Sequence, residues 1–295
     1  MPFRHVALLI LLCVIWAANV IVSRIVVTDL AFPPLSYSAW RSVITLLVLV
    51  PWLHWPGRDW WRVALVTTAV SGGGFALFFI GLKDASPSSA AIVNLTGAPL
   101  TVLFAMIVLK EKVHWRRAAG IVLVFGGVVI AVASPHGWAN STGLMYVFAG
   151  AVVGALGSVY LKTIDLAPLK LMAWAGFFSS LCLLPLSLIF ESGQLAAIRA
   201  NPFDLTLALA FSSIVVSVFA HTAYFGILQA NEAGVVAPIT LLTPVFTIAM
   251  GAVFTGDEVG PLMIAGGLLA CAGVLVIVVR PSRTLFKGLL VRGRI

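Results

Sequence analysis

The sequence contains very little charge. Only 9% of its residues are Asp, Glu, Lys or Arg, whereas 61% are hydrophobic. A water-soluble domain carries about a quarter charged residues, which cover its surface. A chain of 295 residues with so few charges cannot cover itself in that way. The composition therefore predicts a protein that crosses a membrane several times.

Cysteine is also scarce. Cys13, Cys182 and Cys271 each lie inside an apolar run and are far from one another in the sequence. The chain has no Cys-x-x-Cys pair, so neither a disulfide framework nor a metal site is indicated. We expect no metal and no cofactor.

Carboxylates are missing from the middle of every apolar run. The acidic residues lie in predicted loops or at the ends of runs: Asp29, Asp59, Asp84, Glu111, Asp165, Glu191, Asp204, Glu232, Asp257 and Glu258. Carriers coupled to protons or sodium commonly keep a carboxylate at membrane depth.

Paired carboxylates, an HExxH motif and a Ser/His/Asp set are missing as well, so we do not expect an enzyme.

The apolar runs that remain account for nearly the whole chain. We predict an all-α polytopic membrane protein with ten transmembrane helices, because each run is long enough to span a membrane. The predicted spans are Val6–Val27, Leu35–Leu53, Arg62–Leu82, Ser88–Leu109, Arg117–Ala133, Gly143–Lys162, Leu171–Phe190, Phe203–Leu228, Gly234–Phe254 and Leu262–Val279. The first run has full span length and precedes another span, so we expect it to be retained rather than cleaved as a signal peptide.

Basic residues gather on alternate loops. The net charge of +8 does not indicate a nucleic-acid partner, because the basic residues lie at the ends of apolar runs rather than on a soluble face. Fourteen of them fall on the side of the N-terminus, and two, Lys83 and Arg199, fall on the other. By the positive-inside rule, both termini are predicted to be cytoplasmic in a plasma (bacterial inner) membrane.

The chain repeats itself. The stretch FFIGLKDASPSSAAIVNLTGAPLTVLFAMIV is similar to AYFGILQANEAGVVAPITLLTPVFTIAMGAV. The pairs at a spacing of 145 are Gly81 with Gly226 and Pro99 with Pro244, and those at 147 are Gly120 with Gly267 and Gly126 with Gly273. With five spans in each half, the second half enters the membrane from the opposite side, as in the inverted repeats of secondary transporters. We predict a first half at 1–135, a second half at 136–281 and a basic cytoplasmic tail at 282–295.

Several of these stretches resemble the drug/metabolite transporter superfamily, and within it the EamA-type branch. They are VIWAANVIVSR, PPLSYSAWRSVITLL and GAPLTVLFAMIVLKEKV in the first half, and TPVFTIAMGAVFTGDEV and IAGGLLACAGVLVIV in the second. The resemblance covers Val6 to Val279 and implies a ten-helix carrier, often an exporter of amino acids and related metabolites. It also implies a central cavity lined mainly by the third, fourth, eighth and ninth spans and by parts of the first and sixth.

Polar and small residues step along one face of the fourth and ninth spans. The candidate residues on these faces are Asn94 and Thr101 with Gly97, and Thr240, Thr243 and Thr247. Such a face indicates either the wall of an aqueous cavity or close helix packing through small residues, and both interpretations stay open. Pro99 and Pro244 disturb the two helices at equivalent points and are the predicted hinge or bend positions.

Other candidates are not repeated. Ser217, His221 and Tyr224 share a face of the eighth span, whereas their equivalents in the third span are apolar or glycine. His221 is the sole histidine inside a predicted span, so both a proton-carrying role and a packing role are open. Trp16 and Asn19 share a face of the first span, and the aromatic pair in the third span, Phe75 and Phe79, suits a substrate with apolar surface.

Arg41 lies early in the second span. Three interpretations are open for a charge in this position: the side chain reaches the headgroups, pairs with a structural partner, or binds a substrate carboxylate. Taken together, the sequence predicts a secondary transporter that moves a small polar metabolite by alternating access. The expected partners are a small-molecule substrate and the lipid bilayer, and the chain is expected to be a monomer or homodimer. The alternatives are a multidrug efflux carrier and a channel-like facilitator.

Overall fold

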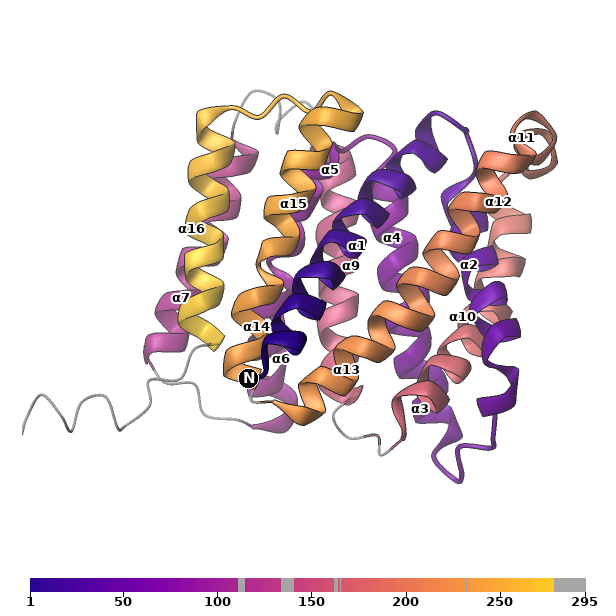
Figure 1. Ribbon diagram of the computed structural model, residues 1–295, viewed down its shortest axis with the longest axis horizontal. Helices are drawn as coiled ribbons and strands as arrows, with labels where there is room; N and C mark the ends of the chain where they lie inside the picture. The colour runs from indigo at the N-terminus through magenta and orange to yellow at the C-terminus, as the bar shows by residue number, and fades with distance from the viewer. Residues whose placement is uncertain (111–114, 134–140, 162–163, 165, 232, 279–295) are drawn as a thin grey trace, which may run out of the picture.

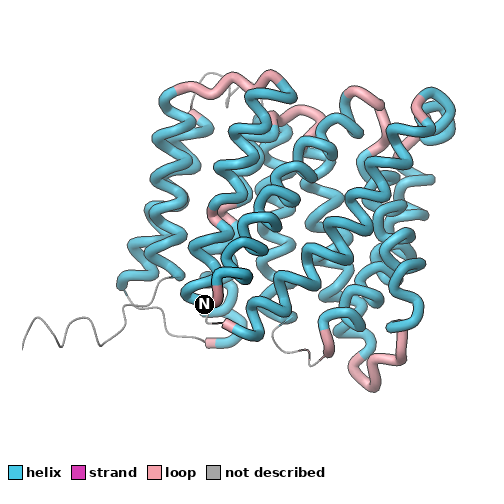
Figure 2. Tube along the Cα trace, viewed as in Figure 1, coloured by secondary structure: helices cyan, strands magenta, loops and turns pink. Residues whose placement is uncertain are grey.

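The computed structural model describes residues 1–110, 115–133, 141–161, 164, 166–231 and 233–278. Helices account for nearly all of these residues (Figure 2), and the described part of the chain has no strand. Ten helical stretches are long and apolar enough to span a membrane. The ten-span prediction is confirmed, since each predicted end falls within four residues of an observed one. The predicted tail at 282–295 lies outside the described residues.

Each half contributes five spans. In the first half they are α1 (Phe3–Thr28); α2 (Pro34–Leu49) with η1 (Val50–Trp52); α3 (Trp60–Thr67), η2 (Thr68–Gly74) and α4 (Phe75–Gly81); α5 (Pro87–Asn94) and α6 (Gly97–Leu109); and α7 (Trp115–Val132). In the second half they are α9 (Ser141–Leu161); α10 (Pro168–Phe190); α12 (Pro202–Ala210), η3 (Phe211–Ala220) and α13 (His221–Ala230); α14 (Ala233–Thr240), α15 (Leu242–Met250) and η4 (Gly251–Thr255); and α16 (Pro261–Val278).

The two halves are inverted with respect to one another. Equivalent helices run antiparallel and side by side: α7 packs against α16 at one edge of the bundle, and α2 packs against α10 at the other (Figure 1). Between these edges, α1 packs against the eighth and ninth spans, and its equivalent α9 packs against the third and fourth. This reciprocal packing is what a pseudo-two-fold axis in the membrane plane produces.

Glycines allow α7 and α16 to approach closely. A Cβ atom at Gly120 would lie 2.8 Å from the carbonyl oxygen of Gly273, and one at Gly127 would lie 2.5 Å from that of Gly266. In a pair of helices related by a two-fold axis, these two contacts are reciprocal if Gly120 is equivalent to Gly266 and Gly127 to Gly273. The spacing here is therefore 146, and the predicted pairs at 147 were wrong by one residue.

The fourth and ninth spans are both broken near their middle. In the fourth span, Leu95 and Thr96 separate α5 from α6, and in the ninth, Leu241 separates α14 from α15. Each break lies three or four residues before Pro99 or Pro244, whose rings exclude the carbonyl of residue i−4 and remove its hydrogen bond. Both prolines were predicted to mark bends, and the structure has a break in the helix just before each of them.

The third and eighth spans share a different irregularity. In both, the middle of the helix is wound as a π-helix, at η2 in the third span and at η3 in the eighth. A π-helical turn is wider than an α-helical one and frequently marks a functional position. Two pairs of equivalent spans, the third with the eighth and the fourth with the ninth, therefore depart from regular α-helix in their interior.

One end of the bundle is closed. At the end opposite the N-terminus, Val26, Phe32, Leu82 and Ala90 are buried in one apolar cluster that joins the first four spans. At this end the structure also contains a short helix that the sequence did not predict, α11 (Gln194–Ala200), between the seventh and eighth spans (Figure 1).

Candidate functional site

The larger of two neighbouring cavities lies between the halves, where the irregular helices meet. It has a volume of about 420 Å³ and receives residues from the first, third, fourth, sixth, eighth and ninth spans. These are the six spans that the family resemblance implied. Its lining residues come from the middle of their spans. The cavity adjoins the apolar cluster, since Val20, Phe75 and Phe78 line the cavity and also pack against that cluster.

Several predicted residues meet on the wall of this central cavity. The predicted site residues that line it are Trp16, Asn19, Phe75, Asn94, Thr101, His221 and Thr243. Asn94 ends α5 at the helix break and its side chain is exposed, although it lies at mid-span. The indole nitrogen of Trp16 is buried and has no hydrogen-bond partner among the described residues, whereas the Thr243 hydroxyl lies within bonding reach of the Cys13 thiol. An unpaired donor on a cavity wall can bind a polar ligand at little further desolvation cost.

A chain of hydrogen bonds holds the wall behind Asn19. The Ser212 hydroxyl donates to Asn19 Oδ1 at 2.8 Å and is also bonded to the Tyr37 hydroxyl. Ser23 donates to the carbonyl of Asn19 at 2.6 Å. These bonds connect the first, second and eighth spans, so the Asn19 amide is fixed in orientation.

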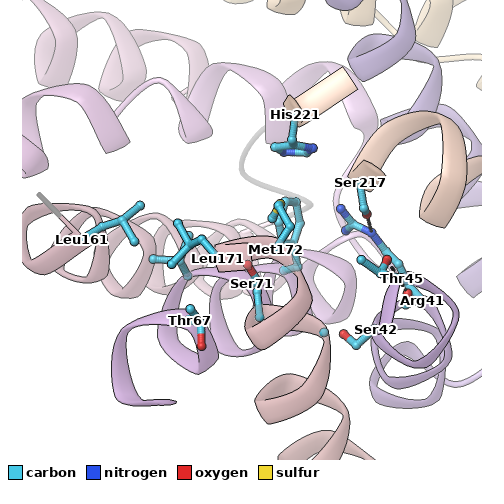
Figure 3. Close-up of a pocket in the computed structure, with 14 residues that line it drawn as sticks. Arg41, Ser42, Thr45, Thr67, Ser71, Leu161, Leu171, Met172, Ser217 and His221 are labelled. Carbon is cyan, nitrogen blue, oxygen red and sulfur yellow. Dashed lines mark hydrogen bonds between the residues drawn. The ribbon is translucent and has the colours of Figure 1, made fainter. Parts of the chain in front are cut away.

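A second, smaller cavity of about 160 Å³ adjoins the first, and we call it the side chamber. It lies between the second, third and seventh spans and the ends of the sixth and eighth, and Phe75 and His221 line both cavities. Most of its surface is apolar, with Leu161, Leu171 and Met172 toward the N-terminal end of the bundle. Figure 3 shows these apolar residues on one side of the chamber and Arg41 with Ser217 on the other.

Arg41 is the charged residue of the side chamber. Its side chain is only 5% exposed, so it does not reach the headgroups. The Nε atom donates to the Ser217 hydroxyl at 2.9 Å, and the guanidinium carbon lies 4.1 Å from the centre of the Phe75 ring. The Nη1 atom is buried and has no hydrogen-bond partner in the described part of the chain.

His221 lies where the two cavities meet. Its Nδ1 atom lies 2.7 Å from the carbonyl oxygen of Val216, five residues earlier in the π-helical turn. A carbonyl only accepts, so we assign the proton of the neutral ring to Nδ1, which leaves Nε2 as an acceptor. The rings of Trp16 and Phe75 lie against the imidazole, with centroids at 5.8 and 6.4 Å.

Four predicted site residues line neither cavity. Phe79 is fully buried against Tyr37, with ring centroids 4.9 Å apart, and Tyr224 packs edge-on against Trp16. Thr247 is fully buried and donates to the carbonyl of Thr243 at 2.9 Å. The predicted face of three threonines assumed a continuous helix, but the break at Leu241 separates Thr240 from the other two.

The sequence analysis named no individual residue of the sixth span. Gly150, Gly154 and Ser158 line the central cavity at steps of four residues along α9. The same reasoning missed the hydroxyls of Thr45 and Ser71 in the side chamber. The small residues of α9 could have been found by their helical spacing, whereas Thr45 and Ser71 stand in no pattern that distinguishes them from packing residues.

Comparison with known proteins agrees with this arrangement. A model described as the EamA-like transporter family matches residues 4–133 and again residues 141–279. The chain is 28% identical over 282 residues to a "Probable amino-acid metabolite efflux pump" of Salmonella typhimurium, covering 91% of this chain and 93% of that protein. A protein of the same description from Escherichia coli is 25% identical over the same length. A solved structure matches with a TM-score of 0.55 at 17% identity, over 98% of this chain and 99% of that one, which is a likeness of fold alone.

Proposed function

The chain belongs to the EamA-like transporter family, and from that premise we propose that it exports amino acids or related small metabolites by alternating access. The relatives described as amino-acid metabolite efflux pumps support the substrate class. The observation that carries the proposal is the central cavity, which both halves line at the depth where four spans are broken or π-helical. A midplane site between inverted repeats is the arrangement that rocking of the halves requires.

The proposed transport cycle follows from the closed end. We propose that the apolar cluster at the end opposite the N-terminus separates the mid-span cavity from that side. With both termini in the cytoplasm, as the basic loops predict, this state receives substrate from the cytoplasm. Bending at the interrupted fourth and ninth spans would then open the opposite end. Reporter fusions to the C-terminus that are active only in the cytoplasm would test this orientation.

Liposome flux tests the function itself. Purified protein in proteoliposomes, loaded with labelled amino acids and their relatives, should release at least one of them with a rate that saturates with concentration. Flux that rises linearly without saturation would instead identify a channel-like pore. If the protein releases no amino acid or related metabolite but does release organic cations, the multidrug alternative is favoured.

The lining of the cavities argues against organic cations as substrates. Among the residues that the structure describes, neither cavity is lined by Asp or Glu, which are the residues that would neutralise a cationic drug. A reaction catalysed by the chain is not proposed either, since the polar groups on the cavity wall are amides, hydroxyls, an indole and the His221 imidazole, and no nucleophile is hydrogen-bonded to that imidazole among the described residues.

A further inference from the structure

Arg41 carries a positive charge at membrane depth, and none of the carboxylates in the described ranges forms an ion pair with it. The one ion pair in the described part of the chain joins Arg62 and Asp59 at a loop, and it does not involve Arg41. Its side chain is 95% buried, and its Nη1 atom has no partner. A buried charge without a counter-ion costs free energy, and removing the cost needs an anion that the described residues do not supply.

Arg24 shows what a structural arginine looks like in the same protein. Its Nη1 atom donates to the carbonyl oxygens of Leu82 and Lys83, where the third span ends. Arg41 has no such carbonyl partner in the described ranges, and Ser217 is the one side chain to which it donates. The difference indicates that the partner of the Arg41 guanidinium is a bound ligand rather than another group of this protein.

The position of Arg41 suits a ligand rather than a lipid. Phe75 lies over the guanidinium and lines both cavities, as does His221, so the charge stands beside the residues that the two cavities share. On the other side of the chamber, Leu161, Leu171 and Met172 offer apolar surface (Figure 3). A molecule with one anionic end and an apolar body fits this combination.

We propose that Arg41 binds the carboxylate of the transported substrate and that the apolar body of the substrate occupies the side chamber. This proposal rests on the proposed export function and specifies its substrate class: monocarboxylates with an apolar body, such as apolar amino acids and their 2-oxo acid relatives. A charged amine is not required, because no Asp or Glu among the described residues lines either cavity to pair with it. A planar guanidinium suits this task, since it can form two parallel bonds to a carboxylate.

Three probes of similar shape test the proposal on the wild-type protein. They are leucine, 4-methyl-2-oxopentanoate, which lacks the amine, and leucinamide, which lacks the carboxylate. Binding is measured by thermal shift and by competition against efflux of labelled leucine. Leucine and the 2-oxo acid should bind with comparable affinity. The affinity for leucinamide should be lower by at least about tenfold, the factor expected for the loss of one charge-assisted hydrogen bond. Equal binding of leucinamide and leucine, or binding of neither carboxylate, would overturn the proposal.

Variants then assign the effect to Arg41. Arg41→Gln should lower the affinity for leucine about tenfold or more and abolish the preference over leucinamide, whereas Arg41→Lys should keep part of both. Arg24→Gln, with its carbonyl partners outside the cavities, should leave the preference unchanged even if it lowers the melting temperature. Ser217→Ala keeps the charge and should weaken leucine binding by less than Arg41→Gln.

The outcomes separate this proposal from the proposed function. If Arg41→Gln still prefers leucine over leucinamide as the wild type does, Arg41 is not the carboxylate site, although export stands. If the Gln variant does not fold, the Lys and Ser217→Ala variants and the wild-type probes decide. If the wild type exports leucinamide with saturation and ignores both carboxylates, a transporter remains but its substrate class is different. If the wild type moves nothing, the proposed function fails first.

Discussion

At the scale of single residues, the cavity wall is made of groups whose hydrogen bonds are incomplete. Backbone and side-chain polar groups buried in a membrane protein are normally paired, because hydrocarbon offers no partner. Here the Trp16 indole has no partner among the described residues, whereas the Oδ1 atom of Asn19, on the same wall, accepts from Ser212. We therefore expect the unpaired indole to contact substrate and the paired groups to hold the wall in shape.

Filling the cavity should stop transport. Asn94→Leu and Thr243→Leu each place a bulky apolar side chain in the cavity, and we expect efflux to fall by at least about tenfold while the protein still inserts, because both the volume and a polar contact are lost. Thr206→Leu is the matched control, since Thr206 is exposed and bonds to its own helix at Pro202. Efflux at the wild-type rate in both cavity variants would show that substrate takes another route.

His221 should determine how transport responds to pH if it carries a proton. Glutamine can still donate to the Val216 carbonyl but does not titrate, so His221→Gln separates the two roles. If His221 carries a proton during transport, wild-type efflux depends on pH and the variant loses that dependence. The charged group nearest to it on the chamber wall is Arg41, so the profile is to be repeated in Arg41→Lys, which keeps that charge. Coincident profiles of wild type and His221→Gln would leave His221 with a packing role.

At the scale of elements, rigid and deformable helices are kept apart. The α7–α16 pair is regular and joined by glycine contacts, whereas the third, fourth, eighth and ninth spans are broken or π-helical at mid-depth. Close backbone contact through small residues is what stabilises helices in a membrane, where the hydrophobic effect does not act between them. The α7–α16 edge thus forms a fixed support, and the irregular spans around the cavity are the ones able to bend.

Adjacent glycines in α7 provide a test of this support. A Cβ atom at Gly127 would lie 2.5 Å from backbone atoms of α16, whereas one at Gly126 would meet nothing within 4 Å. Gly127→Ala should therefore destabilise the protein by about 1–3 kcal/mol, the usual cost of overpacking, and lower its melting temperature in detergent. Gly126→Ala should leave the melting temperature unchanged or raise it slightly. Equal melting temperatures for the two variants would mean that the helices separate easily.

At the scale of the whole molecule, carboxylates connect the two halves at the closed end. Asp257, after the ninth span, accepts from the backbone N–H and the hydroxyl of Ser88 at the start of α5. Glu191, after the seventh span, accepts from the backbone N–H groups of Leu35 and Ser36 at the start of α2, at 2.8 and 2.9 Å. Both carboxylates face helix N-termini of the opposite half, where negative charge is favoured. Opening this end would break these contacts.

Replacing Asp257 should favour the state in which the bundle is open at the end opposite the N-terminus. In a background with the three native cysteines replaced, Asn94→Cys places a thiol in the cavity. A membrane-impermeant maleimide, applied from the side opposite the N-terminus, should label this thiol slowly. It should label the Asp257→Ala variant about tenfold faster, since charge-assisted bonds that hold the end closed are lost. Asp204→Ala, at an exposed residue near the same end, is the control and should not change the rate. A rate unaffected by Asp257→Ala would mean that these contacts do not hold this end closed.

The sequence alone was sufficient for the architecture. Apolar runs of span length fix where helices form, because no other structure satisfies the backbone in hydrocarbon. The odd number of spans per repeat fixes the inversion, and the prolines at 99 and 244 mark where two helices break. Each of these features depends on residues that are close together in the sequence or on the number of spans, so the sequence is enough to predict it.

Only the tertiary structure decided which polar residues form a site. Thr243 and Thr247 look alike in the sequence, yet Thr243 lines the central cavity, whereas Thr247 is fully buried and bonds to its own helix. Arg24 and Arg41 are likewise both arginines inside a span, and only the contacts show that one is satisfied and the other is not. A hydrogen bond between two helices depends on how each helix is rotated about its axis and on where it is broken. The residue pattern of a single helix determines neither.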